Sequence, residues 1–230
     1  MESATFTFPA AYIIEMDGLM LNSEVIFQAA RQAELVSLGY QPLPQTTYLQ
    51  LVGRSNDQAE KLLLQLLGAD FAVDRFRTGW TARWQTLAAQ GIPLKPGLEP
   101  LLDWLDQMGI SKAVGTSSND HEAHISLKST GLWSRFEAIV TVDKAGGQGK
   151  PAPDIFLTAA KALNISPMQC LVLEDSNAGV QAAIAAGMGV IMVPDLQTPT
   201  EFSQQQALAI VPSLHEVLAQ LQSRWQATLS

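Results

Sequence analysis

The stretch Tyr12-Ile13-Ile14-Glu15-Met16-Asp17-Gly18 sets the expected fold of this 230-residue chain. Its first three residues form the kind of aromatic and β-branched run that is found in buried strands. Two carboxylates and a glycine follow within four residues, which is typical of a strand that ends in a turn. We therefore expect a buried strand with acidic side chains at its carboxyl end.

A helical block follows this strand. Apolar residues recur at helical spacing from Ser23 to Gly39, and further helices are expected over residues 55–67, with Ser55 as the N-cap, and 74–90. Residues 23–90 contain no strand pattern. The block therefore interrupts the chain between its first strand and whatever that strand pairs with.

After residue 92, strands alternate with helices. Strands are expected at 112–115, 138–141, 170–173, 189–193 and 207–211. Helices are expected at 98–108, 120–131, 154–163, 177–187 and 213–222. The polar run Gln204–Gln206 is interpreted as a solvated turn. The alternation predicts an α/β fold with a parallel sheet covered by helices. We assign residues 1–19 and 92–230 to the α/β core and residues 20–91 to an inserted all-helical cap.

Composition narrows the class of protein. Hydrophobic residues make up 47% and charged residues 16%, as in a globular domain. The single Cys170 excludes an internal disulfide and a thiolate metal cluster. No apolar run approaches the ~18–20 residues of a membrane span, and the first residues do not resemble a signal peptide, so we expect a cytoplasmic protein without a membrane partner. The net charge of −8 argues against binding nucleic acid. We expect a monomer or a weak dimer.

Chemically useful side chains follow the predicted strands. In an open α/β sheet, ligands bind beyond the carboxyl ends of the strands. The residues expected there are Glu15, Asp17, Thr116, Ser117, Lys150, Glu174 and Asp175. Clustered carboxylates repel one another unless they share a hard cation such as Mg²⁺, whereas hydroxyls, backbone N–H groups and a lysine suit a phosphoryl group. Each residue alone could be a turn, cap or solvated residue, but together they predict Mg²⁺-assisted phosphoryl transfer.

Four motifs resemble those of the haloacid dehalogenase superfamily, in the branch of hydrolases similar to β-phosphoglucomutase and phosphoglycolate phosphatase. They are IEMDGLMLNSE at 14–24, VGTSS at 114–118, GKPAPD at 149–154 and LEDSNAG at 173–179. VGRS at 52–55 and LKPG at 94–97 also match, and the resemblance spans about residues 10–222. It implies a Rossmann-like parallel-sheet core with a helical cap inserted after the first strand. It also implies hydrolysis in two steps through an aspartyl-phosphate.

The resemblance also implies roles for individual residues. Asp17 would be the general acid and base and would ligate Mg²⁺ through its backbone carbonyl. Thr116 and the backbone N–H of Ser117 would bind the transferring phosphoryl group, and Lys150 would neutralise its charge. In the cap, Arg54 is the candidate for substrate binding, because a guanidinium can clamp a second phosphate or a carboxylate. The alternative for Arg54 is an exposed arginine at a helix end.

Glu15 stands where the family has its aspartate nucleophile. The resemblance implies that Glu15 can still ligate Mg²⁺ together with Asp17, Asp175 and Glu174. Its carboxylate reaches one C–C bond further, ~1.5 Å, and a misplacement of ~1 Å can slow a reaction ~10²-fold. Three interpretations stay open: a slow native enzyme that uses Glu15, a protein that has lost turnover and keeps phosphate-ester or Mg²⁺ binding, and an Asp→Glu change in this copy of an ordinary phosphatase.

We therefore expect a Mg²⁺-dependent phosphatase that acts on a small phosphorylated metabolite, such as a sugar phosphate. The first alternative is a non-catalytic protein that senses a phosphorylated ligand. A phosphosugar mutase is less favoured, because the family's mutases have a histidine four residues after the position of Ser23, where this chain has Phe27. A dehalogenase is disfavoured, because Glu174 and Asp175 would have no purpose in it.

Overall fold

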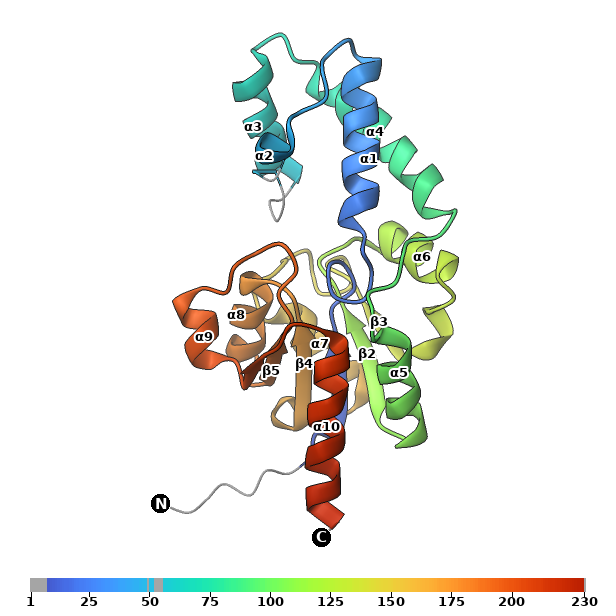
Figure 1. Ribbon diagram of the computed structural model, residues 1–230, viewed down its shortest axis with the longest axis vertical. Coiled ribbons are helices and arrows are strands. Elements are labelled where there is room, and N and C mark those ends of the chain that lie inside the picture. The colour runs from blue at the N-terminus through green and yellow to red at the C-terminus, as the bar shows by residue number, and fades with distance from the viewer. Residues whose placement is uncertain (1–7, 49, 52–55, 230) are drawn as a thin grey trace.

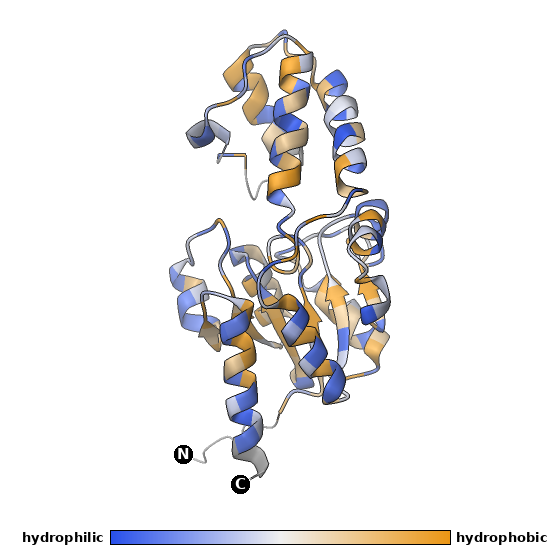
Figure 2. Ribbon diagram, turned by 45° about the vertical axis from the view of Figure 1, so that its right-hand side comes forward, coloured by the Kyte–Doolittle hydropathy of each residue, from blue (hydrophilic) through white to orange (hydrophobic). Residues whose placement is uncertain are grey.

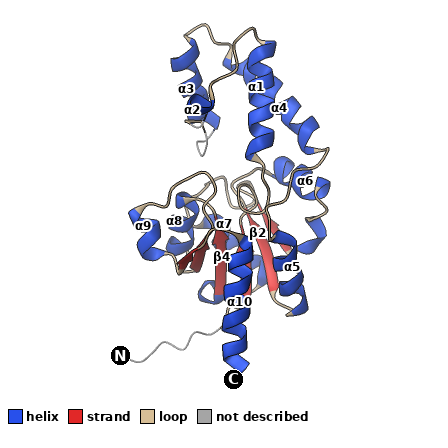
Figure 3. Cartoon of the chain, viewed as in Figure 1, coloured by secondary structure: helices blue, strands red, loops and turns tan. Residues whose placement is uncertain are grey.

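The computed structural model describes residues 8–48, 50–51 and 56–229. Its centre is a parallel six-stranded sheet in the order β3-β2-β1-β4-β5-β6. Figure 3 shows strands in the middle of this part of the molecule with helices around them. The strands are β1 Ala11–Ile14, β2 Ser111–Gly115, β3 Ala138–Val140, β4 Cys170–Glu174, β5 Gly189–Met192 and β6 Ala209–Ile210. The predicted α/β fold with a Rossmann-like parallel sheet is confirmed.

β1 lies in the middle of the sheet because all of its side chains can be buried. It pairs in parallel with β2 on one side and β4 on the other, and its four residues have no exposed surface. Tyr12 and Ile14 point into one hydrophobic cluster, whereas Ala11 and Ile13 point into the other. Strands covered on both faces are expected to be apolar throughout, which explains the uninterrupted run in the sequence.

Helices cover both faces of this sheet (Figure 1). They are α5 Leu98–Gln107, α6 Asp120–Ser129, α7 Asp154–Leu163, α8 Asn177–Ala185, α9 Glu201–Gln206 and α10 Leu214–Leu229. Two short 3₁₀ turns span Trp133–Arg135 and Pro167–Gln169. The buried side chains of α5 and α10 join the cluster that contains Tyr12, and those of α7 and α8 join the cluster that contains Ile13.

The helices between β1 and α5 lie beyond the carboxyl ends of the strands (Figure 1). They are α1 Glu24–Ser37, α2 Gln45–Tyr48, α3 Asn56–Leu67 and α4 Val73–Ala88. α1 packs along α4, where the ring of Phe27 stacks on that of Trp84 at a centroid distance of 5.4 Å. Figure 2 shows hydrophobic strands inside the molecule and many hydrophilic residues on the helices. The division into a core and a cap at residues 19/20 and 91/92 stays a prediction.

The two connections between these helices and the sheet run side by side. Leu21 and Leu94 form an antiparallel bridge, and the N–H of Asn22 donates to the carbonyl of Pro93 at 2.8 Å. The Lys95 ammonium also pairs with Asp195, in the loop after β5, at 2.6 Å. The entry and the exit of the helical segment are therefore hydrogen-bonded to each other.

The structure corrects some details of the sequence reading. Gln204–Gln206 is the second half of α9 rather than a turn, because Thr200 caps the helix by accepting from the N–H of Ser203, and glutamine is a good helix former. The short helix α2 was not expected. The last strand covers only two residues, and α10 extends to Leu229. The predicted N-cap Ser55 lies outside the described residues. None of the described helices is long and apolar enough to cross a membrane.

Gly97, which precedes α5, is a position where the structure requires glycine. This residue has a φ of +91°, and a Cβ there would lie 2.5 Å from the backbone nitrogen of His215 at the start of α10. Gly39 is a matched control, because its φ is +87° and no atom of the described residues lies within 4 Å of the position of its Cβ.

We expect Gly39→Ala to lower the free energy of unfolding by ~1–2 kcal/mol through backbone strain alone. Gly97→Ala should cost a further ~1–3 kcal/mol, because α10 must move. Urea unfolding of the two variants measures the difference. Equal losses would contradict the close packing of α5 against α10.

Candidate active site

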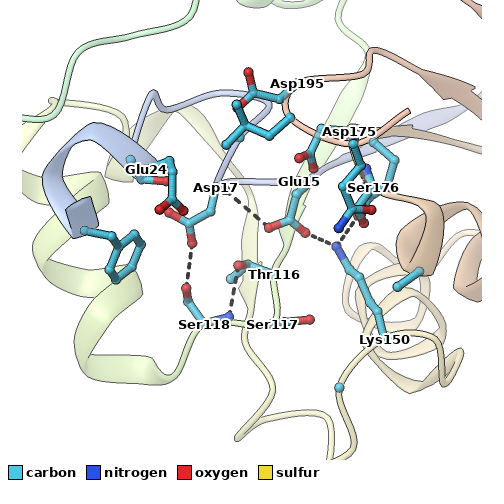
Figure 4. Close-up of a pocket in the computed structure, with 18 of the residues that line it drawn as sticks. Glu15, Asp17, Glu24, Thr116, Ser117, Ser118, Lys150, Asp175, Ser176 and Asp195 are labelled. Atoms are coloured by element: carbon cyan, nitrogen blue, oxygen red, sulfur yellow. Dashed lines mark hydrogen bonds and ion pairs between the residues drawn. The ribbon is translucent and has the colours of Figure 1, made fainter. Parts of the chain in front are cut away.

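A cavity of about 520 Å³ opens beyond the carboxyl ends of the strands (Figure 4). The sheet side supplies most of its polar lining: Glu15, Asp17, Thr116, Ser117, Ser118, Lys150, Glu174, Asp175, Ser176 and Asp195. The helical segment supplies Ser23, Glu24, Phe27, Arg31 and Leu51. All the predicted site residues are therefore in one cavity except Arg54, which lies outside the described residues.

Strand register brings these side chains together. Ile14 is paired with Val114 of β2 and with Leu173 of β4. The N–H of Glu15 continues the ladder by donating to the carbonyl of Leu173 at 3.0 Å. The residues that follow the paired positions therefore emerge next to one another at the same edge, as expected for parallel strands.

Lys150 is a cation of this cavity whose side chain is only 5% exposed. Its ammonium pairs with the carboxylate of Glu15 and lies 2.5 Å from that of Glu174. It also donates to the carbonyl of Gly115 at 3.0 Å and lies 4.7 Å from the ring centroid of Phe156. Because an unpaired buried charge is costly, Lys150 and the two carboxylates stabilise one another, and together they connect the ends of β1, β2 and β4.

Glu174 is fully buried, and both of its oxygens are engaged. Oε1 faces Lys150, and Oε2 accepts from the N–H groups of Asp175 and Ser176, each at 2.8 Å, and from the Ser176 hydroxyl at 2.9 Å. A Cβ on Gly179 would lie 1.9 Å from the Glu174 carboxyl carbon, so glycine leaves room for this carboxylate. Glu174 therefore fixes the loop after β4.

Neither Asp17 nor Asp175 forms a salt bridge with another described residue, whereas Glu15 and Glu174 pair with Lys150 and Asp195 pairs with Lys95. Asp17 Oδ2 accepts from the Ser118 hydroxyl at 2.6 Å, whereas Oδ1 is buried and has no hydrogen-bond partner among the described residues. Burial raises the pKa of Asp17. Burial, followed by the charge of Glu174, raises the pKa of Asp175 well above 3.8. A Cβ on Gly18 would lie 2.3 Å from Asp175 Oδ2, so the Asp175 carboxyl reaches the turn after β1.

Glu15 uses both of its oxygens inside the protein. Oε1 accepts from the N–H of Asp17 at 3.3 Å, and Oε2 pairs with Lys150. Nearby, Thr116 Oγ1 accepts from the N–H of Ser118 at 3.1 Å, which leaves the Thr116 hydroxyl proton to be donated elsewhere. Within the described part of the chain, no three acidic, histidine or cysteine side chains already form a metal-binding group. Lys150 stands between Glu15 and Glu174 instead.

Sequence reasoning missed several lining residues. Glu24, Phe27 and Arg31 line the cavity from α1 at positions i, i+3 and i+7, a spacing that could have placed them on one helix face. Ser118 is the last residue of the recognised motif VGTSS at 114–118, but no role was assigned to it, because its contact with Asp17 spans 101 residues of sequence. Asp195 carries no local signal, since only the position of the loop after β5 brings it to the cavity.

Comparisons with known proteins identify similar sequences. The family model of haloacid dehalogenase-like hydrolases matches residues 12–193. A fructose-1-phosphate phosphatase from Escherichia coli is 30% identical over 184 residues, which cover 80% of this chain and 96% of that protein. A probable pseudouridine-5'-phosphatase from Drosophila melanogaster is 32% identical over 188 residues, which cover 80% of each protein.

Solved structures show the same fold. A crystal structure of a HAD family hydrolase from Deinococcus radiodurans, with bound phosphate and sodium, aligns with a TM-score of 0.75 at 27% identity. The alignment covers 92% of this chain and 96% of that one. The helical segment and the sheet are therefore found in a similar arrangement in another protein.

The raised pKa of Asp175 predicts how stability depends on pH. Because the folded state holds the Asp175 proton more tightly than the unfolded state, stability decreases as pH rises from about 3.8 through the folded pKa. Asp175→Asn removes this titration. We expect the variant to gain stability relative to the original chain between pH 4 and pH 7, by ~1.4 kcal/mol per pH unit that separates the two pKa values.

Urea unfolding in metal-free buffer at pH 4 and pH 7 tests this expectation. Comparing the two pH values cancels the cost of burying the amide, which does not depend on pH. A stability difference between variant and original chain that stays constant over this range would show that Asp175 is not destabilised by its surroundings.

Proposed function

The chain belongs to the haloacid dehalogenase-like hydrolase family, and from this membership we propose that it is a Mg²⁺-dependent phosphatase of a small phosphorylated metabolite, such as a sugar phosphate. The observation that carries the proposal is the convergence of Glu15, Asp17, Thr116 and Lys150 on one cavity. The phosphatase relatives support a small leaving group of sugar or nucleoside type. A cytoplasmic location and a monomer or weak dimer stay predictions.

The proposed reaction has two steps. In the first, a carboxylate oxygen of Glu15 attacks phosphorus, the P–O bond to the leaving group breaks, and Asp17 gives its proton to the leaving oxygen. In the second, Asp17 takes a proton from water, and the water oxygen attacks phosphorus. Inorganic phosphate then leaves, and the Glu15 carboxylate is restored. The raised pKa of Asp17 supports its role as an acid that is protonated at the start of the cycle.

Three groups would hold the phosphoryl group during both steps. The Thr116 hydroxyl can donate to a phosphoryl oxygen, since its own oxygen already accepts from Ser118. The backbone N–H of Ser117 would add a second donor. Lys150 supplies positive charge at the same edge of the sheet. Such preorganised donors stabilise the charge that develops on a transferring phosphoryl group.

The donor set also fits Mg²⁺. The acids offer only oxygen ligands, and the surroundings of Asp175 disfavour its ionised form unless a cation lies beside it. We propose that Glu15, Asp175 and the backbone carbonyl of Asp17 hold the ion and that Glu174 contributes negative charge beside it. Bound Mg²⁺ would supply Lewis-acid stabilisation of the phosphoryl oxygens.

One observation favours a second candidate, a protein that binds a phosphorylated ligand without turnover. Both oxygens of Glu15 already face partners, and one of them pairs with Lys150. An attacking carboxylate must give up part of this pairing and must also fit its longer side chain behind the phosphoryl group. The three interpretations of Glu15 therefore stay open.

Replacing Glu15 by aspartate separates these candidates. We expect the original chain to hydrolyse p-nitrophenyl phosphate and sugar phosphates slowly with Mg²⁺, and Glu15→Asp to raise kcat by about 10²-fold, because the shorter side chain restores the attack distance. Glu15→Gln is the control without a nucleophile. Rates within tenfold of each other would contradict the distance penalty, and no turnover by either protein would favour the binding protein.

Asp17→Asn tests the acid and base. We expect kcat to fall ~10²–10⁴-fold for an alkyl phosphate, whose leaving oxygen needs a proton. The loss in the first step should be smaller for p-nitrophenyl phosphate, whose leaving group departs as a stable anion. The rate constant of p-nitrophenol release in single-turnover measurements reports the first step, attack by Glu15, alone. Equal losses for both substrates would contradict proton donation by Asp17.

A further inference from the structure

One face of α1 forms the wall of the cavity opposite the sheet. Glu24, Phe27 and Arg31 lie on this face and line the cavity. These three side chains present an acceptor, a ring and a guanidinium to whatever is attached to the phosphoryl group. Their use as a recognition surface rests on the phosphatase function proposed above.

The Glu24 carboxylate is held in place by a buried tyrosine. The Tyr48 hydroxyl donates to Glu24 Oε1 at 2.7 Å, and Tyr48 is only 1% exposed. Arg31 donates to the same hydroxyl at 3.5 Å, and its guanidinium lies 4.9 Å from the ring centroid of Trp80. The carboxylate therefore has a fixed direction, so a substrate does not have to order it on binding.

Glu24 lies on the side of the cavity where the leaving group of a substrate would be. Figure 4 shows its carboxylate beside that of Asp17, the residue proposed to give a proton to the leaving oxygen. Glu24 is thus placed to contact the carbon atoms that follow the ester oxygen. An ionised carboxylate accepts hydrogen bonds from hydroxyl groups and repels another carboxylate.

The charge of the cavity strengthens the preference for a hydroxyl group over a carboxylate in the substrate. Among the described lining residues, seven are acidic and two are basic. The acids are Glu15, Asp17, Glu24, Glu122, Glu174, Asp175 and Asp195, and the bases are Arg31 and Lys150. Lys150 is already paired with two of the acids, and so the excess of acidic groups in the lining as a whole disfavours a further anion.

We propose that Glu24, oriented by Tyr48 and Arg31, is a specificity-determining residue that selects leaving groups with a hydroxyl near the ester oxygen and rejects those with a carboxylate there. The substrate class is then a phosphorylated polyol or sugar, and phosphorylated hydroxy acids are excluded. Phe27 lines the same wall and would contact the C–H groups of such a molecule.

A pair of substrates that differ at one carbon tests the proposal. In 2-hydroxyethyl phosphate a hydroxymethyl group occupies the position that a carboxylate has in 2-phosphoglycolate. We expect kcat/KM to favour 2-hydroxyethyl phosphate by at least about tenfold, since like charges at contact distance repel strongly even at an effective dielectric constant of ~20. Glu24→Gln should reduce this preference by about fivefold or more, mainly through a lower KM for 2-phosphoglycolate.

Two further variants separate recognition from structural effects. Tyr48→Phe removes the hydroxyl that orients Glu24 and should weaken the preference less than Glu24→Gln does. Glu99→Gln changes an exposed acid of α5 and should leave the preference unchanged. Turnover of p-nitrophenyl phosphate by Glu99→Gln should stay within threefold of that of the original chain. For Glu24→Gln and Tyr48→Phe, the test is the ratio of the two kcat/KM values rather than either rate alone. Thermal unfolding checks that each variant is folded.

The measurement distinguishes this proposal from the proposed activity. If p-nitrophenyl phosphate is hydrolysed but the preference is absent, or is unchanged in Glu24→Gln, the Glu24 proposal is wrong and the phosphatase function stands. A preference for 2-phosphoglycolate would also overturn it and would favour the anion clamp predicted for Arg54. If the original chain and Glu15→Asp both lack turnover, calorimetric titration of the two intact ligands into the original chain and Glu24→Gln gives the same comparison as a ratio of Kd values.

Discussion

The site depends on the ion pairs that the Lys150 ammonium forms with the carboxylates of Glu15 and Glu174. This ammonium stands where β1, β2 and β4 end, and it also reaches the carbonyl of Gly115. The carboxylates at the ends of β1 and β4 would repel one another without it. A buried pair of this kind costs desolvation and is retained only when every charge is satisfied, which holds for Lys150 and Glu174. The Lys150 ion pairs therefore determine both the positions of these side chains and the balance of charge at this edge of the cavity.

This pairing also explains how a glutamate can occupy the end of β1. The longer side chain of Glu15 reaches Lys150 and still accepts from the N–H of Asp17, so the fold tolerates it without an orphaned charge. Stability and catalysis make different demands at this position, because pairing requires only contact, whereas attack on phosphorus requires a distance set to a fraction of an ångström. An intact edge of the sheet is therefore compatible with a working enzyme and with a binding protein.

Much of the fold could be predicted because local signals were strong. The apolar run before Glu15 marks a strand buried on both faces, and the alternating pattern after residue 92 gives the parallel sheet. The helix α9 was missed because its cap, Thr200, was not recognised before a polar glutamine run. The site acids were predictable because they follow strands directly. The contacts of Glu24 with Tyr48 and of Lys95 with Asp195 were not, since helix packing and the loop after β5 bring those pairs together.

The place of Glu24 along α1 distinguishes it from the other residues of the cavity wall. It begins the helix two residues after Asn22, whose N–H is bonded to the returning chain at Pro93. Any rotation of the helices about these paired connections moves a residue in proportion to its distance from them. Arg31 is seven residues further along the helix, ~10 Å at 1.5 Å per residue, and would move much further. Glu24 would therefore move less than Arg31 through such a rotation, so its position relative to Asp17 depends least on the orientation of the helices.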